Sequence, residues 1–390
     1  MQENLKGLLG LIPEPPEWEA DWTEIEKTEL YSMIGQMKET LQNPLWHREG
    51  DVWTHTRMVC GELVRMNRFR QLPDRQRQEL FLAALLHDIG KIPCTRLEDG
   101  VWISPNHTSA GARMARELLW STYGLCGSRE DRTFRETVCS LIRYHSVPMH
   151  IMEQENPERR LIRIAANGEL SGDFTIDLLC MLEEADGYGR TAESKQESVD
   201  VVRLCAELAD EAGVLKQPFS FSSAYTEHAY LTGRISRPEF ELYDDTWGEV
   251  ILLSGMPGTG KDTWIQEHCG TLPVVSLDVL RKEMHISPKE EQGAVVNAAR
   301  ERAKEYLRKK QPFVWNATNL TPSVREKLIH LFENYHAAVR IVFLETQWEE
   351  ELRRNQSRKE EVPASVIRRM LRSLVVPERF EAQYVEWHCV

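Results

Sequence analysis

Two kinds of hydrophobic pattern divide this chain. From the N-terminus to about residue 212, apolar residues recur at spacings of three and four, which is the period of an amphipathic helix. Short segments with proline, glycine and asparagine separate these stretches. The pattern predicts an almost entirely helical domain over 1–212, with helices at Trp22–Gln42, Val52–Arg68, Asp74–His87, Ser109–Tyr123, Arg132–Tyr144, Pro157–Ala166, Ile176–Ala185 and Ser198–Ala212.

The pattern is lost over 213–247, which contains two prolines, Gly233 and four serines between Ser220 and Ser236. We expect this segment to connect two domains. Beyond it, short apolar runs alternate with helical stretches, which predicts an α/β domain with a parallel sheet over 248–390. The expected strands are Glu249–Ser254, Pro273–Leu277, Phe313–Asn316 and Ala338–Leu344, and the expected helices are Lys261–Cys269, Lys289–Lys310, Pro322–Tyr335 and two more at the end of the chain.

Composition is that of an ordinary globular protein: 41% of the 390 residues are hydrophobic and 28% are charged. The longest apolar runs, such as Phe81–Leu86, are far shorter than the roughly 20 residues of a membrane span, and no targeting signal is recognisable. Eight cysteines are scattered without a C-x-x-C pair, which favours a reducing, cytoplasmic compartment. We therefore expect a cytoplasmic protein with no membrane association.

The net charge of −13 argues against a protein that coats nucleic acid by bulk electrostatics. Positive charge is nevertheless concentrated in the C-terminal third, in the runs Arg300–Lys310 and Arg353–Arg372. Either run is also compatible with a solvated helix face.

A glycine-rich turn, Gly255-Met256-Pro257-Gly258-Thr259-Gly260-Lys261, follows the first strand and opens a helix. This is the context of a P-loop, in which backbone N–H groups surround phosphates and the lysine reaches the β and γ oxygens of a nucleoside triphosphate. The sequence thus predicts a site for ATP or another NTP with Mg²⁺. The expected binding residues are Gly255, Gly258, Thr259, Gly260, Lys261, Asp262, Thr263, Arg354 and Arg358.

The residue after the P-loop lysine is usually serine or threonine, whose hydroxyl binds Mg²⁺. Here it is Asp262, and Thr263 comes next. A carboxylate can also bind Mg²⁺, although it adds negative charge beside a triphosphate. The sequence leaves open whether Asp262 or Thr263 contacts the metal.

Phosphoryl transfer to an alcohol requires a base near the hydroxyl and positive charge around the phosphate. Asp278 lies just after the second strand, and Arg281 follows one helical turn later. Small polar residues end the third strand at Trp315–Leu320. Arg354 and Arg358, four residues apart, suit a lid over about 347–373 that closes on the phosphoryl group. A helix N-cap at Asp278 and solvated surface arginines are the alternatives.

The motifs GMPGTGKDT, SLDVLR, NATNLTP and RNQSR, in this order over 248–390, resemble the 5′-hydroxyl polynucleotide kinases of RNA and DNA repair. The resemblance implies that Asp278 is the general base for the 5′-OH and that Arg281 holds the adjacent phosphate. It also implies that Arg354 and Arg358 contact the ATP phosphates. Because this family often has aspartate where this chain has Asn316 or Ala317, no acidic role on the third strand is carried over.

An adjacent histidine and aspartate, His87-Asp88, end an apolar helix, where burial is costly unless something is bound. With residues before and after them they form the H…HD…D signature of the HD phosphohydrolase superfamily, which the chain resembles over 40–195. Two intervening histidines match the variant of that superfamily that binds two metals. The expected ligands are His55, His87, Asp88, His107, His145 and Asp186.

Such a centre would activate a water and hold phosphate oxygens, and Lys91 is expected to add charge near the leaving phosphate. The ligand types fit Mn, Fe, Ni, Co, Cu or Zn, without a choice among them. His107 and His145 are also compatible with hydrogen-bonded core histidines. We assign no role to His47, Glu49 or Asp51 from the sequence.

Nearly the whole chain resembles bacterial enzymes that fuse an HD domain to a polynucleotide kinase and heal RNA ends. The resemblance implies phosphorylation of 5′-OH ends and removal of 3′-phosphate, 2′-phosphate or 2′,3′-cyclic phosphate ends of RNA or DNA, before a separate ligase seals them. One alternative is a nucleotide phosphohydrolase fused to a small-metabolite kinase. Another is a non-catalytic, nucleotide-regulated RNA-binding module.

Overall fold

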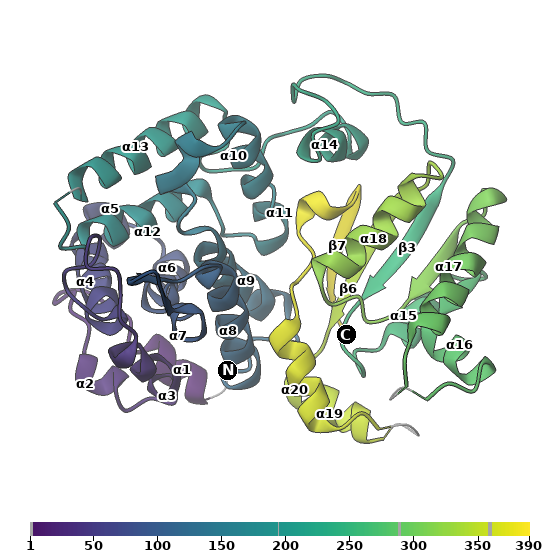
Figure 1. The fold of residues 1–390 in the computed structure, drawn as a ribbon, viewed down its shortest axis with the longest axis horizontal. Helices are drawn as coiled ribbons and strands as arrows, with labels where there is room; N and C mark the ends of the chain where they lie inside the picture. The colour runs from purple at the N-terminus through teal and green to yellow at the C-terminus, as the bar shows by residue number, and fades with distance from the viewer. Residues whose placement is uncertain (1–2, 194, 288–289, 358–360) are drawn as a thin grey trace. The chain divides into compact units, whose positions relative to one another are not determined.

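The computed structural model describes residues 3–193, 195–287, 290–357 and 361–390, and it divides into two compact units (Figure 1). The first unit holds residues 1–125 and 130–219, and the second holds 126–129 and 220–390. The segment expected as a connector, 213–247, is thus shared between them. Most of it belongs to the second unit because the helix α14 (Ala224–Leu231) buries Ala229, Tyr230 and Leu231 there.

The first unit is helical, as predicted, with one small antiparallel hairpin. Its α-helices are α1 (Glu3–Leu9), α2 (Trp22–Ile25), α3 (Tyr31–Ile34), α4 (Val52–Arg65), α5 (Asn67–Arg70), α6 (Asp74–Leu86), α7 (Lys91–Cys94), α8 (His107–Ser121), α9 (Arg129–Tyr144), α10 (Pro157–Ala165), α11 (Gly168–Ser171), α12 (Ile176–Tyr188) and α13 (Lys195–Glu211), with 3₁₀ helices η1 (Gly35–Glu39) and η2 (Pro148–Glu153).

Two details of this unit differ from the prediction. The single helix expected over Trp22–Gln42 is wrong, because this stretch forms the short helices α2, α3 and η1. The Thr28 hydroxyl bonds the carbonyl of Ile25 at 2.7 Å, a local bond that competes with continued helix. The hairpin of β1 (Arg96–Glu98) and β2 (Val101–Ile103) was also not predicted. Its turn is Asp99-Gly100, both with positive φ, which is a hairpin signal visible in the sequence.

The helix α6 forms the centre of the first unit. Every residue from Glu79 to Leu86 is buried, and α4 and α12 both pack against this helix. Fully burying each large apolar side chain stabilises the fold by about 1.5–3 kcal/mol. The carboxyl end of α6 is therefore a rigid support for the two residues that follow it, His87 and Asp88.

The second unit is an α/β domain whose sheet has five parallel strands in the order β4-β5-β3-β6-β7. Its strands are β3 (Glu249–Ser254), β4 (Val274–Ser276), β5 (Phe313–Asn316), β6 (Ala338–Glu345) and β7 (Tyr384–Cys389). Its remaining helices are α15 (Lys261–His268), α16 (Leu277–Glu283), α17 (Gly293–Arg308), α18 (Pro322–Glu333), α19 (Trp348–Gln356), α20 (Ala364–Ser373) and η3 (Arg379–Glu381).

The hydrophobic pattern predicted that two helices end the chain. This prediction is wrong, because the chain continues beyond α19 and α20. It returns to the sheet as β7, which pairs only with β6. In this edge strand Val385 alone is buried, so the strand lacks the strong apolar signal of the inner ones.

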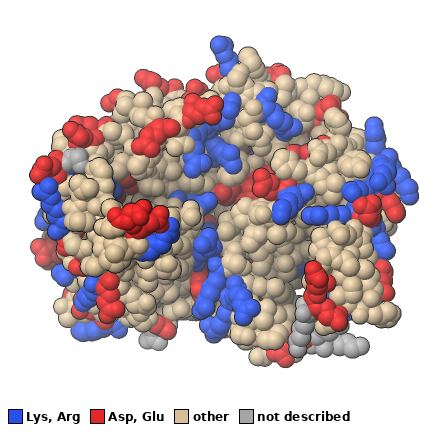
Figure 2. Space-filling model, viewed as in Figure 1, with Lys and Arg blue, Asp and Glu red and all other residues tan. Residues whose placement is uncertain are grey.

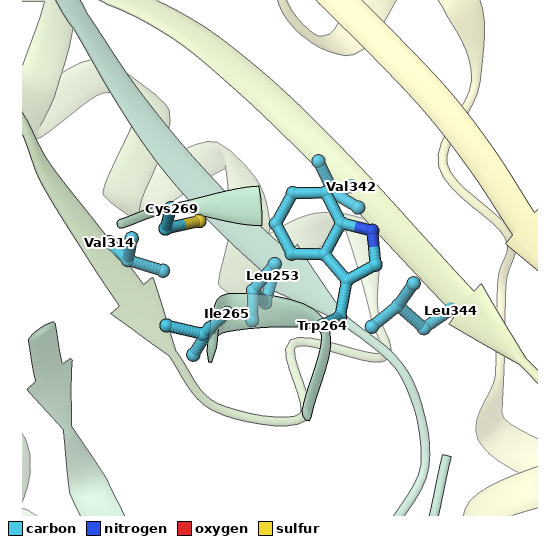
Figure 3. Packing of buried hydrophobic residues seen from close by; sticks show 7 residues of the cluster. All are labelled: Leu253, Trp264, Ile265, Cys269, Val314, Val342 and Leu344. Atoms are coloured by element: carbon cyan, nitrogen blue, oxygen red, sulfur yellow. The ribbon is translucent and has the colours of Figure 1, made fainter. Parts of the chain in front are cut away.

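The helix α15 packs tightly onto the sheet. Figure 3 shows Trp264 and Ile265 of this helix, and Cys269 directly after it, against side chains of three strands, namely Leu253, Val314, Val342 and Leu344. All seven residues are at most 8% exposed. This packing fixes the start of α15, where the glycine-rich turn lies.

On the face drawn in Figure 2, positive and negative side chains are interspersed. None of the eight cysteines forms a disulfide. Within the described residues, the structure contains no helix with the length and apolar character of a membrane span.

Candidate active sites

The Asp88 carboxylate lies at the centre of a cluster of histidines in the first unit. Its Oδ2 is 3.3 Å from Nε2 of His87 and 3.8 Å from Nε2 of His55. Its Oδ1 is 3.6 Å from Nε2 of His107 and 4.0 Å from Nε2 of His145. Two ligands of one metal, each about 2.1 Å from it, lie roughly 3–3.5 Å apart. One carboxylate thus faces two histidine pairs, the arrangement of a bridging ligand.

Asp186 completes the first pair. Its Oδ1 is 2.8 Å from Nε2 of His55 and 4.0 Å from Nε2 of His87, and its Oδ2 is bonded by Arg190. The structure therefore brings together all six residues that the sequence predicts as metal ligands. They come from α4, the end of α6, α8, the end of α9 and α12.

Three of the histidines are oriented by their own preceding turns. The Nδ1–H groups of His87, His107 and His145 each donate to a backbone carbonyl three residues earlier, at 2.8 Å. This bond selects the tautomer whose Nε2 lone pair points to Asp88. Burial, together with the neighbouring histidines, lowers the pKa of His145 to about 3, and burial lowers the pKa of His107. Both rings are therefore neutral, the form that binds a metal.

His55 is oriented differently, by the carboxylate of Glu49. Glu49 Oε1 is 3.0 Å from Nδ1 of His55 and 2.8 Å from Nδ1 of His47, and its Oε2 accepts bonds from Thr191 at 3.2 and 2.6 Å. Burial alone would lower the pKa of His55, but Asp186 and Glu49 outweigh burial and raise it. Glu49 had no role in the sequence prediction, and its proximity to His55 in the sequence was the available signal.

The atoms that face one another in this cluster fit a cation. Within the described ranges of the chain, the buried Nε2 atoms of His55 and His87 and the buried Oδ1 of Asp186 make no hydrogen bond, despite their close approach. Unpaired buried polar atoms cost free energy, and convergent nitrogen and oxygen lone pairs are the donor set of a divalent transition metal. These six residues would hold such ions.

Lys91 and Gly90 complete this centre. Lys91 Nζ is 2.7 Å from Oδ2 of Asp88 and 2.7 Å from Oε1 of Gln42. Although burial opposes ionisation of Asp88, Lys91 and His87 hold its pKa well below the usual range. A Cβ added to Gly90 would lie 2.0 Å from the backbone oxygen of His107, so only glycine allows α8 to approach this closely.

In the second unit the glycine-rich turn has the backbone of a phosphate-binding loop. Gly255, Gly258 and Gly260 all have positive φ, and a Cβ at Gly255 would lie 2.6 Å from the carbonyl of Leu344. Lys261 Nζ donates to the carbonyls of Gly255 and Met256 at 2.8 and 2.7 Å, folded over the loop. Among the other predicted binding residues, Thr259 is buried, with its hydroxyl bonded to the carbonyl of Met256, whereas Thr263 is exposed.

Asp278 lies at the same edge of the sheet as this loop. Ser276, the last residue of β4, pairs with Asn316, the last residue of β5, and β5 lies beside β3. Because all these strands are parallel and about 4.8 Å apart, their carboxyl ends meet at one edge. Asp278 is in the first turn of α16 and does not cap that helix; Ser276 does. The exposed carboxylate of Asp278 is paired with Arg281, and Nε of Arg281 donates to Gln292 at 2.8 Å.

The predicted lid begins with α19, and Arg354 lies on this helix. A Cβ at Gly260 would be 3.5 Å from Nη1 of Arg354, so this arginine is beside the phosphate loop. Its Nε donates to Glu350 at 2.6 Å. Arg358 lies outside the described residues.

Glu351, which the sequence analysis did not single out, is fully buried next to the loop. Its backbone oxygen is 3.1 Å from the position that a Cβ would take at Gly258. Among the described residues neither carboxyl oxygen has a hydrogen-bond partner, and burial raises the pKa of Glu351 to about 8, against the opposing effect of Lys261. The acidic run that contains it gave no indication of which glutamate is buried.

Comparisons with known proteins match a domain family in each of the two units. Residues 52–167 match the HD domain family, and residues 250–377 match a family described as an AAA domain. Among solved structures, the chain is similar to a gluconokinase from Sinorhizobium meliloti 1021, with 22% identity over 36% of this chain and 83% of that one, and a TM-score of 0.28. The chain thus contains an HD domain in its helical unit and a P-loop kinase-like domain in its α/β unit.

Proposed function

We propose that this chain heals broken nucleic-acid ends, phosphorylating 5′-OH ends in its second unit and removing terminal phosphates in its first. Domains of both kinds are usually enzymes, and the residue types of each site are suited to holding phosphate. The observation that carries the proposal is the Asp278–Arg281 pair at the sheet edge that also bears the P-loop, since a base and a phosphate-binding arginine together suit an acceptor with a hydroxyl next to a phosphodiester.

In the kinase reaction, the 5′-hydroxyl oxygen attacks the γ-phosphorus of the NTP, and the bond to the β-γ bridging oxygen breaks. The hydroxyl proton passes to the Asp278 carboxylate, and the nucleoside diphosphate leaves. Lys261 must exchange its bonds to the Gly255 and Met256 carbonyls for the β and γ oxygens. Arg354, beside Gly260, is placed to stabilise the charge that develops on the transferred group.

In the first unit, two divalent ions would supply a water that ionises near neutral pH and would hold the phosphate oxygens. The six ligand residues fix these positions, and the backbone bonds of His87, His107 and His145 keep their lone pairs directed inward. Lys91, which lies against Asp88 at this centre, would be available to balance charge on the leaving 3′-oxygen as the bond between that oxygen and phosphorus breaks.

The test uses a short RNA with a 5′-OH and a 3′-phosphate, labelled ATP and the full chain. Asp278→Asn should lower 5′ labelling by about 10²- to 10⁴-fold, the usual contribution of a general base, and leave phosphate release unchanged. Asp88→Asn should lower phosphate release and leave 5′ labelling unchanged. Glu283→Gln, on the same helix as Asp278, and the exposed Asp74→Asn are the matched controls.

Loss of both activities in either folded variant would contradict two separate sites. Labelling of nucleosides or sugars without labelling of the RNA would favour a small-metabolite kinase instead, and hydrolysis of free nucleotides alone would favour a nucleotide phosphohydrolase. Parallel DNA substrates, a series of NTP donors and addition of a ligase to the healed product would define the acceptor, the donor and the downstream partner.

A further inference from the structure

The first helical turn after the P-loop contains an unusual hydrogen bond. Asn316 Nδ2 donates to Oδ1 of Asp262 at 2.7 Å. Asp262 is the residue directly after Lys261, on the exposed side of α15, while Asn316 is the 8%-exposed last residue of β5. Within the described residues, Oδ2 of Asp262 accepts no hydrogen bond. This pair joins the P-loop helix to the neighbouring strand and leaves one carboxylate oxygen free.

In P-loop enzymes generally, the residue after the lysine offers a hydroxyl to Mg²⁺, and an aspartate from a strand holds the ion from the other side. Here β5 lies directly beside β3, with Leu252 opposite Trp315. Asn316 is therefore at the edge from which that aspartate would act. This chain instead has a carboxylate on the helix and an amide on the strand. Compared with the usual arrangement, the pair still carries one negative charge, but the charge lies on the helix and not on the strand.

We propose that Asp262 supplies the protein carboxylate for the Mg²⁺ of the bound nucleotide and that Asn316 is the positioning residue that orients it. The proposal rests on the nucleotide-binding half of the proposed function. The Asn316 amide fixes Oδ1, so that Oδ2 is directed away from the strand. Asp262 and Thr263 are both exposed, but among the described residues only Asp262 has a partner that orients it, so we assign the metal contact to Asp262.

The hydrogen bond predicts how substitutions will combine. Asp262→Ser removes the carboxylate. Asn316→Asp places two carboxylates at the 2.7 Å contact, where neither can donate a hydrogen bond, so they repel each other. The double variant returns the hydroxyl to the helix and the carboxylate to the strand, which restores a donor and an acceptor. Each single change should therefore be harmful and the double change should be milder than their sum.

The experiment measures binding of a fluorescent ADP analogue to the full chain, with Mg²⁺ and with EDTA. In the wild type Mg²⁺ should tighten binding. Asp262→Ser should lower this Mg²⁺-dependent gain by about tenfold or more, in the range typical for disturbed metal sites, while binding in EDTA persists and reports a folded P-loop. Thr263→Ala should keep the full gain. Asp262→Ser combined with Asn316→Asp should recover most of it.

An unchanged Mg²⁺-dependent gain in Asp262→Ser would overturn the proposal, as would loss of the gain in Thr263→Ala. A wild-type chain that binds nucleotide equally well with and without Mg²⁺ would also overturn it. The binding assay contains no substrate that could accept a phosphoryl group. A failure to phosphorylate RNA would therefore not change the measured Mg²⁺ dependence of nucleotide binding. The outcome therefore separates failure of the metal assignment from failure of the end-healing proposal.

Discussion

The buried carboxyl of Glu351 should make the stability of the second unit depend on pH. In the folded chain its pKa is about 8, compared with the ordinary value of 4.5, because the side chain is buried without a hydrogen-bond partner. Between these values the folded state keeps a proton that the unfolded state has lost. Stability must therefore fall as the pH rises from about 4.5 and level off above about 8.

The magnitude follows from the size of the shift. Each unit between the two pKa values is worth about 1.4 kcal/mol, so the penalty approaches about 5 kcal/mol at high pH and grows by about 2 kcal/mol between roughly pH 6 and pH 8. Glu351→Gln keeps the shape of the side chain and removes the titrating proton. The free energy of unfolding of the variant, relative to that of the wild type, should therefore increase by about 2 kcal/mol between roughly pH 6 and pH 8.

Calorimetry of the full chain at several pH values tests this. For a unit of this size, 1 kcal/mol shifts the midpoint by roughly 2–4 °C, so the variant should gain roughly 4–8 °C over the wild type between these two pH values. The transition that rises when nucleotide is added identifies the second unit. Glu349→Gln, an exposed neighbour on α19, is the control. A difference between Glu351→Gln and wild type that does not change with pH would refute the reasoning.

Three further predictions concern the supports of the two sites. Gly90→Ala should lower the metal content, because the added Cβ must displace the His107 carbonyl. Gly61→Ala is the control and should leave the metal content unchanged, because there is open space around Gly61. Elemental analysis after dialysis distinguishes the two variants. Glu49→Gln should weaken metal binding by about 10–100-fold without abolishing it, as expected for a group that orients a ligand, and full retention against a chelator would contradict this role. Trp264→Ala should destabilise the second unit by about 3–5 kcal/mol and leave the calorimetric transition of the first unit in place; a shift of both transitions would contradict independent cores.

Much of both sites could be predicted because their chemistry is encoded locally. A glycine-rich turn between a strand and a helix has few uses other than phosphate binding, and the structure has that turn in that context. A buried His-Asp pair is costly without a ligand, and the resemblance to the HD phosphohydrolase superfamily supplied the other expected ligands, which are distant in the sequence. The residue types could be read from the sequence, and the burial of α6 explains why His87 and Asp88, which follow it, are held firmly.

The features that could not be predicted depend on long-range packing. Glu49 reaches His55 because the chain turns at Gly50, which has a φ of +100°, before α4 begins. The strand β7 has one buried residue, too few to produce a recognisable pattern. Three consecutive residues of α19 are glutamates, and the sequence does not distinguish them. Only the packing of α19 against the P-loop shows that Glu351 is the buried one.

The two buried aspartates of the metal cluster differ from Glu183 and Glu351 in one physical respect, which bears on which of these carboxyl groups can bind metal. Asp88 and Asp186 each have a cation within hydrogen-bond reach, Lys91 and Arg190 respectively, and their pKa values are lowered despite burial. Glu183, one turn before Asp186, is 4.0 Å from the Arg190 guanidinium, and burial and the Asp186 charge raise its pKa.

A carboxyl that keeps its proton is a poor metal ligand, because the proton occupies the lone pair that the metal needs. Glu183 and Asp186 lie on the same helix three residues apart, and spacing alone does not separate them. The direct bond from Arg190 does, since it maintains the charge of Asp186 before any metal arrives. The same logic applies to Glu351, whose carboxyl has no cation in hydrogen-bond contact in the part of the chain that the structure describes and remains protonated near neutral pH. A neutral Glu351 beside Gly258 avoids adding a negative charge where a triphosphate is expected to bind.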